Sequence, residues 1–305
     1  MLRGRVASCA VVTVVFLVAA CGDRSRSNSD SARALAPVFP GAPSGNPGWD
    51  PDAGSVMITP FENSLDTVAV IVPEATDSTV SIVGGSNAPV AGLAFDLFGR
   101  AGKIASVVRS AALTSDTSKL DCSGWPLARL AGKQAGWSVG FTAGRAIAIS
   151  LDSIEALRSS DSASLAASIV RAAATLKSVS DPTFSGLPFR VRAAFTFRLD
   201  SVDVVIADVV RSVNEEANPR IEHLLMVGER LAGSSSQFDV RYSNRTAGSE
   251  ESTQASELLA VVRIGAERRP IIVVSIEYSD GNRLGLLERT GNEWRLVWRS
   301  AYTDC

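Results

Sequence analysis

Apolar and polar residues alternate with a period of two along much of the chain. In the segment 136–150, Trp137, Val139 and Phe141 fall on one face before a polar turn interrupts the pattern. Alternation of this kind is typical of half-buried antiparallel strands joined by short turns. Comparable runs fill residues 187–305, so the pattern predicts β meanders there as well.

One stretch, residues 151–181, follows a different period. The apolar positions that recur at helical spacing are Leu165, Ile169, Ala173 and Leu176. Pro182 follows this stretch, and a proline favours the end of a helix. The sequence therefore predicts an α+β fold, made predominantly of antiparallel β meanders with one helical segment around 151–181. The many alanines of this segment favour close packing of the helix on a sheet.

Two segments of the C-terminal part resemble each other. Residues 223–246 and 283–303 each contain a strand that ends in Glu-Arg, a loop with glycine and a strand led by an aromatic residue. Residues 92–113 give a degraded third copy. Each copy fits a meander of about 45 residues or less, which is compatible with a propeller blade. Blade-like repeats and a β-sandwich both stay open at this point.

The last of these segments contains two tryptophans, Trp294 and Trp298, four residues apart on a predicted strand. Side chains at even spacing on a strand point to the same face of the sheet. We therefore expect both indoles on one side, either as part of the core or as an exposed platform for a carbohydrate.

The first twenty residues have the organisation of a secretory signal. Residues 1–5 carry two arginines and no acid, and residues 6–20 carry no charge. An uncharged run of 15 residues is shorter than the ~20 residues that a membrane-spanning helix needs. The run leads into the sequence VAAC, residues 18–21, which resembles the lipobox of bacterial membrane lipoproteins.

That resemblance implies how the protein is attached to the cell envelope. In this class the chain is cleaved before the cysteine, here Cys21, and the cysteine sulfur carries a diacylglyceryl group. Two or more acyl chains anchor a protein stably, whereas one chain gives only marginal membrane binding. The resemblance therefore implies a signal peptide over 1–20, a lipid anchor in a bacterial membrane, and a body in the periplasm or outside the cell.

Composition divides the rest of the chain. Residues 21–55 are rich in serine, proline, glycine and asparagine and have few large apolar side chains. Such a segment buries too little apolar surface to order itself, so we expect a disordered tether. The body then divides into a β-rich N-terminal part, 56–181, which ends in the helical segment, and a β-rich C-terminal part, 182–305.

Charge and cysteine content limit which partners and which cellular compartment fit this chain. Without residues 1–20 the chain keeps 28 basic against 32 acidic residues, a balance that argues against a nucleic-acid partner. Of the four cysteines, one lies in the signal peptide and Cys21 is the expected lipidation site. The remaining pair, Cys122 and Cys305, predicts one disulfide, because exported proteins form such bonds.

Candidate chemistry gathers around the single histidine, His223. The acids Glu215, Glu216 and Glu222 precede it in the segment 214–223, which is a candidate polar binding loop. A solvated turn has the same composition. The residues give no zinc-ligand set and no phosphate-binding glycine loop, so we expect no metal and no cofactor.

These observations favour an envelope-anchored lipoprotein whose body is a non-catalytic binding or structural module, with an envelope protein or a glycan as partner. Two alternatives stay open. One is an envelope hydrolase that uses the acidic loop 214–223, because paired carboxylates or a single histidine can serve in catalysis. The other is an accessory subunit of a membrane assembly, which predicts a contiguous exposed apolar patch.

Overall fold

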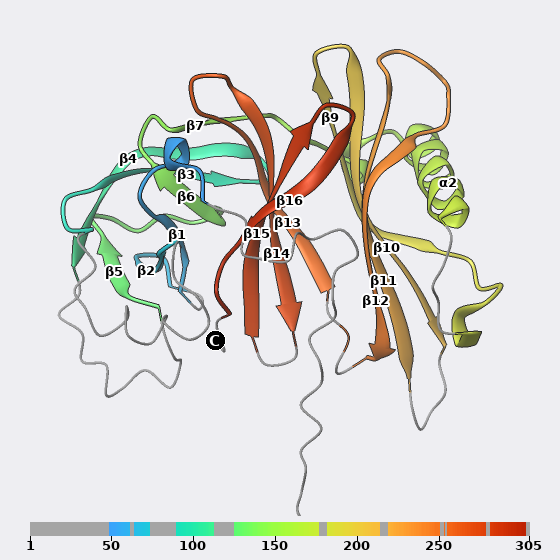
Figure 1. Ribbon diagram of the computed structural model, residues 1–305, viewed down its shortest axis with the longest axis horizontal. Helices are drawn as coiled ribbons and strands as arrows, with labels where there is room; N and C mark the ends of the chain where they lie inside the picture. The colour runs from blue at the N-terminus through green and yellow to red at the C-terminus, as the bar shows by residue number, and fades with distance from the viewer. Residues whose placement is uncertain are drawn as a thin grey trace, which may run out of the picture. The chain divides into compact units, whose positions relative to one another are not determined.

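The described part of the chain is mostly antiparallel β-sheet with one α-helix, which confirms the predicted fold class (Figure 1). This computed structural model describes residues 49–61, 64–73, 90–112, 125–176, 182–213, 219–250, 253, 255–278 and 281–302. All of these residues belong to one unit of the chain, Val38–Cys305.

The N-terminal strands form a closed six-stranded barrel. In spatial order its strands are β1 (Met57–Pro60), β2 (Thr67–Ile71), β5 (Leu127–Leu130), β4 (Gly102–Ala112), β3 (Ala94–Gly99) and β6 (Val139–Thr142). The barrel closes where β6 pairs with β1, with Gly140 opposite Ile58. A Cβ atom on Gly140 would lie 2.5 Å from Ile58 Cγ1, so the close approach of these strands requires glycine.

The C-terminal part folds into two four-stranded meanders, each extended by one short strand. The first sheet has the order β12 (Asp239–Ser249), β11 (Arg220–Leu231), β10 (Val202–Val213), β9 (Arg190–Leu199) and β8 (Asp152–Ser153). The second sheet has the order β16 (Glu293–Arg299), β15 (Gly281–Thr290), β14 (Arg269–Tyr278), β13 (Ala255–Ile264) and β7 (Ala146–Ala148). Because β7 and β8 are consecutive, one short segment of the chain adds the fifth strand to both sheets.

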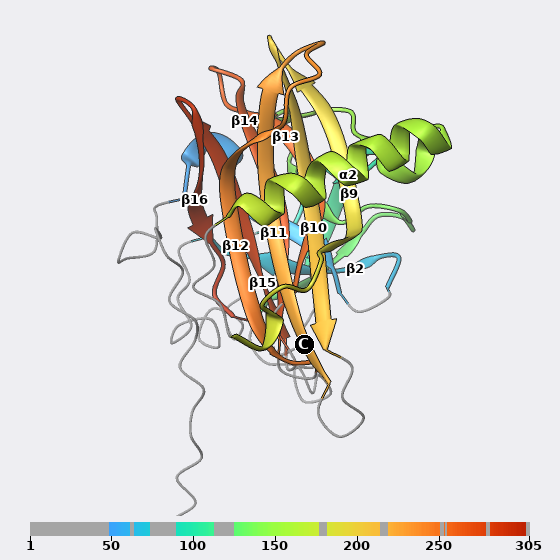
Figure 2. The same cartoon turned by 90° about the vertical axis from the view of Figure 1, so that its right-hand side faces the viewer.

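Buried side chains form separate clusters on the two faces of each sheet. The cluster between the sheets includes Phe197, Ile206, Leu225, Ile272, Leu287 and Trp294. The other face of the first sheet packs against the helix α2 (Ser159–Thr175), which runs across it (Figure 2). The other face of the second sheet shares a cluster with β1, β2, β3 and β6 of the barrel. Each sheet is therefore covered on both faces.

The helix is shorter than the sequence predicts. The apolar pattern predicts helix over 151–181, whereas α2 covers Ser159–Thr175. Its buried side chains include Ile169 and Ala173, which confirms the predicted apolar face. Residues before α2 instead form β8, which pairs with β9, and a 3-10 turn, η3 (Ile154–Ala156). Another 3-10 turn, η4 (Pro182–Phe184), precedes β9.

The two similar C-terminal segments occupy equivalent places in the two sheets. In the β11–β12 hairpin, Glu229 lies opposite Asp239, and a bulge shifts the register one pair further along. In the β15–β16 hairpin, Glu288 lies opposite Arg295, and a bulge follows at the same distance. The similarity in sequence therefore corresponds to a shared strand register.

The matching register of the β11–β12 and β15–β16 hairpins also shows how the two sheets stack. Tyr242 and Trp298 occupy matching positions just beyond the bulge. Tyr242 packs between the two sheets, whereas Trp298 packs between the second sheet and the barrel. Equivalent faces of the two sheets thus point in the same direction, as they do in a stack of repeated units. The described residues nevertheless form a two-sheet sandwich and not a ring of blades. The proposed third copy, 92–113, falls on β3 and β4 of the barrel, so it is not a blade.

The bulge in β16 also makes one prediction wrong. Trp294 packs towards the first sheet and Trp298 towards the barrel, so the two indoles face opposite sides of the second sheet. Leu287 pairs with Leu296 and Leu286 pairs with Trp298, which leaves one additional residue in β16. One additional residue inverts the alternation of side chains beyond it.

Residues 49–55, the last part of the segment expected to form a tether, pack on the body, and the rest of that segment lies outside the described residues. Residues 49–55 contain a 3-10 turn, η1 (Pro51–Ala53), whose Ala53 is fully buried. The ring of Trp49 meets the ring of Trp298 edge-on, with centroids 4.9 Å apart. One large aromatic side chain thus gives this polar segment the apolar surface it needs to pack on the body.

Candidate functional site

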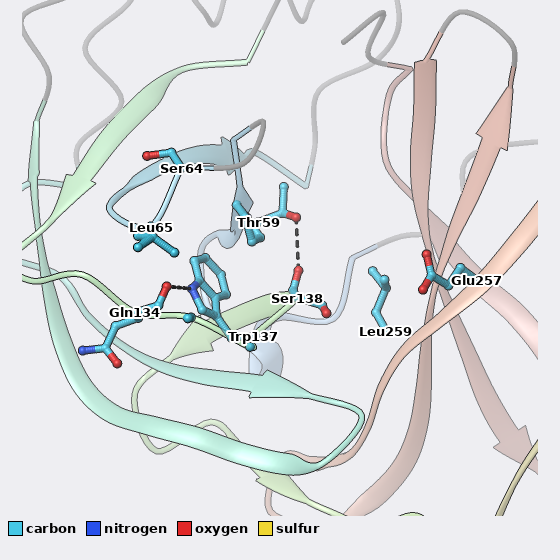
Figure 3. Close-up of a pocket in the computed structure, with 11 residues that line it drawn as sticks. Thr59, Ser64, Leu65, Gln134, Trp137, Ser138, Glu257 and Leu259 are labelled. Atoms are coloured by element: carbon cyan, nitrogen blue, oxygen red, sulfur yellow. Dashed lines mark hydrogen bonds between the residues drawn. The ribbon is translucent and has the colours of Figure 1, made fainter. Parts of the chain in front are cut away.

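An open groove of about 570 Å³ is lined by residues of the barrel and of β13 (Figure 3). Its lining comes from the end of β1 and the turn after it, from the segment 134–138 before β6, and from Glu257 and Leu259 of β13. The volume lies in the range of about 300–1,000 Å³ that small-molecule sites occupy. The lining brings together segments that are far apart in the sequence.

A side-chain hydrogen bond holds the two barrel strands of the groove together. β1 and β6 pair only at Met57 and Ile58. Beyond that pairing, Thr59 Oγ1 donates to the carbonyl of Ser138 at 3.1 Å (Figure 3). The hydroxyl replaces a backbone ladder bond at the point where the strands separate, and the separation opens the groove.

Trp137 lies among the polar residues of the groove and fixes the loop before β6 (Figure 3). Its Nε1 donates to the carbonyl of Gln134 at 3.2 Å, and the residue is only 6% exposed. The amide N–H of Gln134 donates to the carbonyl of Leu65 at 2.8 Å, which joins this loop to the turn after β1. In that turn, Ser64 Oγ accepts a hydrogen bond from the Thr67 amide at 2.9 Å.

Two polar side chains of the lining have no hydrogen-bond partner among the described residues. They are the Ser138 hydroxyl and the Gln134 amide, which contribute only backbone groups to the hydrogen bonds of the loop. A hydroxyl both donates and accepts, and an amide offers two donors and one acceptor oxygen. These two groups are available to a ligand in the groove.

The groove carries little charge. Glu257 is the one charged side chain in the lining that the structure describes. Its carboxylate lies 3.0 Å from Arg100 Nη2, and the two side chains are 39% and 46% exposed. Solvent screens an exposed pair strongly, so the ion pair contributes little to stability and leaves the field in the groove weak.

The structure does not bring the described residues of the predicted polar loop together. Glu215 and Glu216 lie outside the described residues. Glu222 and His223 are consecutive on β11, so their side chains point to opposite faces of the first sheet. Neither residue lines the groove.

Glu222 is fully buried and is held by two arginines. Arg211 donates from Nε and Nη2 to the two carboxylate oxygens, at 3.2 and 2.9 Å, and Arg245 Nη1 donates at 2.7 Å. The Arg211 guanidinium also lies over the Phe189 ring, 4.7 Å from the centroid. Since cations occupy both oxygens of Glu222, this arrangement is a structural ion-pair cluster and offers no free acid or base.

His223 faces an acid that the sequence pattern did not identify. Its Nδ1 lies 3.6 Å from Asp208 Oδ1, and neither atom has a hydrogen-bond partner within the described part of the chain. The other carboxylate oxygen of Asp208 pairs with Arg192. His223 is therefore a nearly buried imidazole beside a carboxylate that already pairs with Arg192, and it lies outside the groove.

The cysteines that the sequence singles out, Cys21, Cys122 and Cys305, lie outside the described residues, so lipidation and the disulfide stay predictions. Over the ranges that the structure describes, no helix is both long and apolar enough to cross a membrane. In the same ranges, no cluster of three or more histidine, cysteine, aspartate or glutamate side chains is placed to hold a metal ion.

The groove leaves no signal in the sequence, because its lining is assembled only by the fold. A second feature does leave a trace in the sequence. Glu229 and Arg289 form an ion pair that joins the two sheets, and each belongs to the Glu-Arg dipeptide of one of the two similar segments. No family model, no curated protein and no solved structure matches this chain. A proposed function therefore rests on the sequence and structure of this chain alone.

Proposed function

We propose that this protein is a bacterial envelope lipoprotein, anchored through Cys21, whose body is a non-catalytic binding module. The apolar leader that ends in VAAC, residues 18–21, supports the anchor. The open groove supports the binding role, because a concave site with a few convergent polar groups is the usual form of a ligand site. This groove is the observation that carries the proposal.

The two alternative functions have less support. Glu222 is bound by two arginines and faces away from His223, so the described residues of segment 214–223 assemble no hydrolytic site. A docking subunit calls for a contiguous apolar patch. Of the large apolar side chains that are exposed in the described ranges, Leu65 lies in the turn after β1, Ile104 on β4, Ile147 on β7 and Leu231 on β11.

The anchor is tested by mass spectrometry of the N-terminal peptide of protein isolated from bacterial membranes. We expect a chain that begins at Cys21 and carries a diacylglyceryl group on the sulfur. The variant Cys21→Ser should move the protein from the membrane fraction to the aqueous fraction, because the acyl chains supply the membrane affinity.

Cys122→Ser is the matched control, since it removes a cysteine of the body and leaves the lipidation signal intact. It should stay in the membrane fraction. A mature chain that still begins at Met1, or one whose Cys21 carries no lipid, contradicts the anchor.

A further inference from the structure

We propose that the groove binds an uncharged, hydroxyl-rich ligand of the oligosaccharide class. This inference rests on the proposed role of the body as a binding module and does not depend on the lipid anchor. Three properties of the lining carry it, namely its charge, its free hydrogen-bonding groups and its apolar surface.

The charge of the lining disfavours anionic ligands. Glu257 is the one charged group in the described lining, and no lysine or arginine accompanies it there. A phosphate or carboxylate would find no guanidinium or ammonium group in the described lining, and the nearby Arg100 is already paired with Glu257. The Arg100–Glu257 pair is exposed on both sides, so it attracts neither sign of charge strongly. A neutral ligand fits this surface best.

Two side chains supply free hydrogen-bonding capacity in the groove, while backbone groups next to them are already used. The amide of Ser138 donates to the Phe98 carbonyl at 2.8 Å, the amide of Gln134 donates to Leu65, and Pro60 has no N–H group. An extended peptide that adds to a strand needs free backbone N–H groups, and these three positions offer none. The free Ser138 hydroxyl and Gln134 amide can instead exchange hydrogen bonds with sugar hydroxyls.

The apolar part of the lining complements these polar groups (Figure 3). Leu65 is 44% exposed at the groove, and Leu259 and Trp137 lie deeper, each less than a tenth exposed. A pyranose ring presents C–H faces between its hydroxyl groups, and the exposed side chain of Leu65 offers such a face an apolar surface. The lining thus offers both kinds of contact that a sugar ring makes.

The experiment measures binding by isothermal titration calorimetry with the purified full-length protein in detergent. The probes are the uncharged tetrasaccharides tetra-N-acetylchitotetraose, maltotetraose and cellotetraose, with N-acetyl-Gly-Ser-Gly-Ser-amide as the uncharged non-sugar probe. We expect binding of at least one oligosaccharide and no binding of the peptide. Gln134→Ala and Ser138→Ala should each weaken that binding about three- to ten-fold, the loss expected for one uncharged hydrogen bond.

Matched controls come from the loop between β11 and β12. Gln237→Ala and Ser235→Ala remove the same two chemical groups at exposed positions outside the groove, and they should leave the affinity unchanged. Circular dichroism confirms that each variant is folded. Because Gln134 and Ser138 use only backbone groups within the protein, their side chains can be shortened without removing a described hydrogen bond.

Three results overturn the inference: no oligosaccharide binds, the peptide binds and the sugars do not, or the groove variants and their controls lose affinity equally. Each of these results leaves the lipid test untouched, because the anchor is measured on a different part of the chain. Conversely, an unlipidated Cys21 removes the anchor and leaves sugar binding in place.

Discussion

The carboxylate of Glu229 on β11 accepts two hydrogen bonds from the guanidinium of Arg289 on β15, at 2.8 and 3.0 Å. Trp294 Nε1 donates to the same carboxylate at 2.7 Å. The hydrogen bond to Glu229 raises the pKa of Arg289, and burial opposes this rise only in part. A charged pair on the buried side of the sandwich thus joins the first sheet to the second.

Replacing Glu229 with alanine should destabilise the protein strongly. The change leaves Arg289 without its partner and Trp294 with an unsatisfied N–H, and removing one member of a buried pair costs several kcal/mol. Because Arg289 is 25% exposed, we expect a loss of about 2–4 kcal/mol in the free energy of unfolding. Urea denaturation followed by circular dichroism measures this loss.

Glu293→Ala is the matched control. Glu293 pairs with Arg295, and both side chains are more than half exposed, so the variant should change stability by about 0.5 kcal/mol or less. Equal losses in the two variants would show that Glu229 contributes no more than a surface ion pair.

Gly140→Ala should destabilise the closure of the barrel. The added Cβ would lie 2.5 Å from Ile58 Cγ1 and 2.9 Å from Leu97 Cδ2, so the strands must move apart or the side chains must change rotamer. Overpacking of this kind costs about 1–3 kcal/mol. The measurement is again the free energy of unfolding in urea. Gly132→Ala, where nothing lies within 4 Å of the added Cβ, should cost far less, and a similar cost would contradict this view of the closure.

Trp49→Ala should weaken the attachment of the segment 49–55. The variant removes the edge-on contact with Trp298 and the hydrogen bond from the indole to the Gly54 carbonyl. Since the residue is only partly buried, we expect a loss of about 2 kcal/mol, below the range for fully buried tryptophans. Limited proteolysis should then cut near residue 49 faster than in the wild type.

Leu231→Ala removes a large apolar side chain that is 69% exposed, and it should leave both stability and proteolysis unchanged. If Trp49→Ala behaves in the same way, the packed segment contributes nothing to the fold.

Alkaline pH should destabilise the protein through Tyr242. Burial raises the pKa of this phenol from 10.0 to about 12. The unfolded state therefore loses its proton first, and the contribution to stability is present below pH 10 and is lost as the pH rises through about 12. We expect the free energy of unfolding to fall by up to about 1.4 kcal/mol per pH unit in this window. Urea denaturation between about pH 9 and pH 11.5 tests this, and Tyr242→Phe should lack this slope; parallel curves for the two proteins would contradict it.

The sequence predicted the fold class well because the alternation of apolar residues reports burial directly. Val139 and Phe141 share one buried cluster, as their spacing predicts, but Trp137 precedes β6 and packs into a different cluster inside the barrel. Trp294 and Trp298 show the complementary limit, because a bulge of one residue leaves no signal in the pattern. Strand register is set by cross-strand packing, which a single segment does not contain.

The candidate site was less accessible to sequence reasoning for a similar reason. Ser138 and Gln134 are ordinary loop residues until the fold places them beside Thr59 and Glu257. Glu222 resembled a solvated acid because its partners, Arg211 and Arg245, lie on neighbouring strands, 11 and 23 residues away. Local composition shows which charged groups are present, but only the pairing of strands shows which of them form ion pairs.

The two meanders stack with equivalent faces pointing in the same direction, and this arrangement has a consequence for assembly. A repeat of this kind has no intrinsic end, because each unit presents a face that another unit can cover, and head-to-tail contacts of this type propagate between molecules unless something blocks them. Here a helix, α2, covers one terminal face, and a closed barrel, which has no free strand edge, covers the other. These two dissimilar caps confine the repeat to two copies and cover the sheet faces on which another molecule could stack.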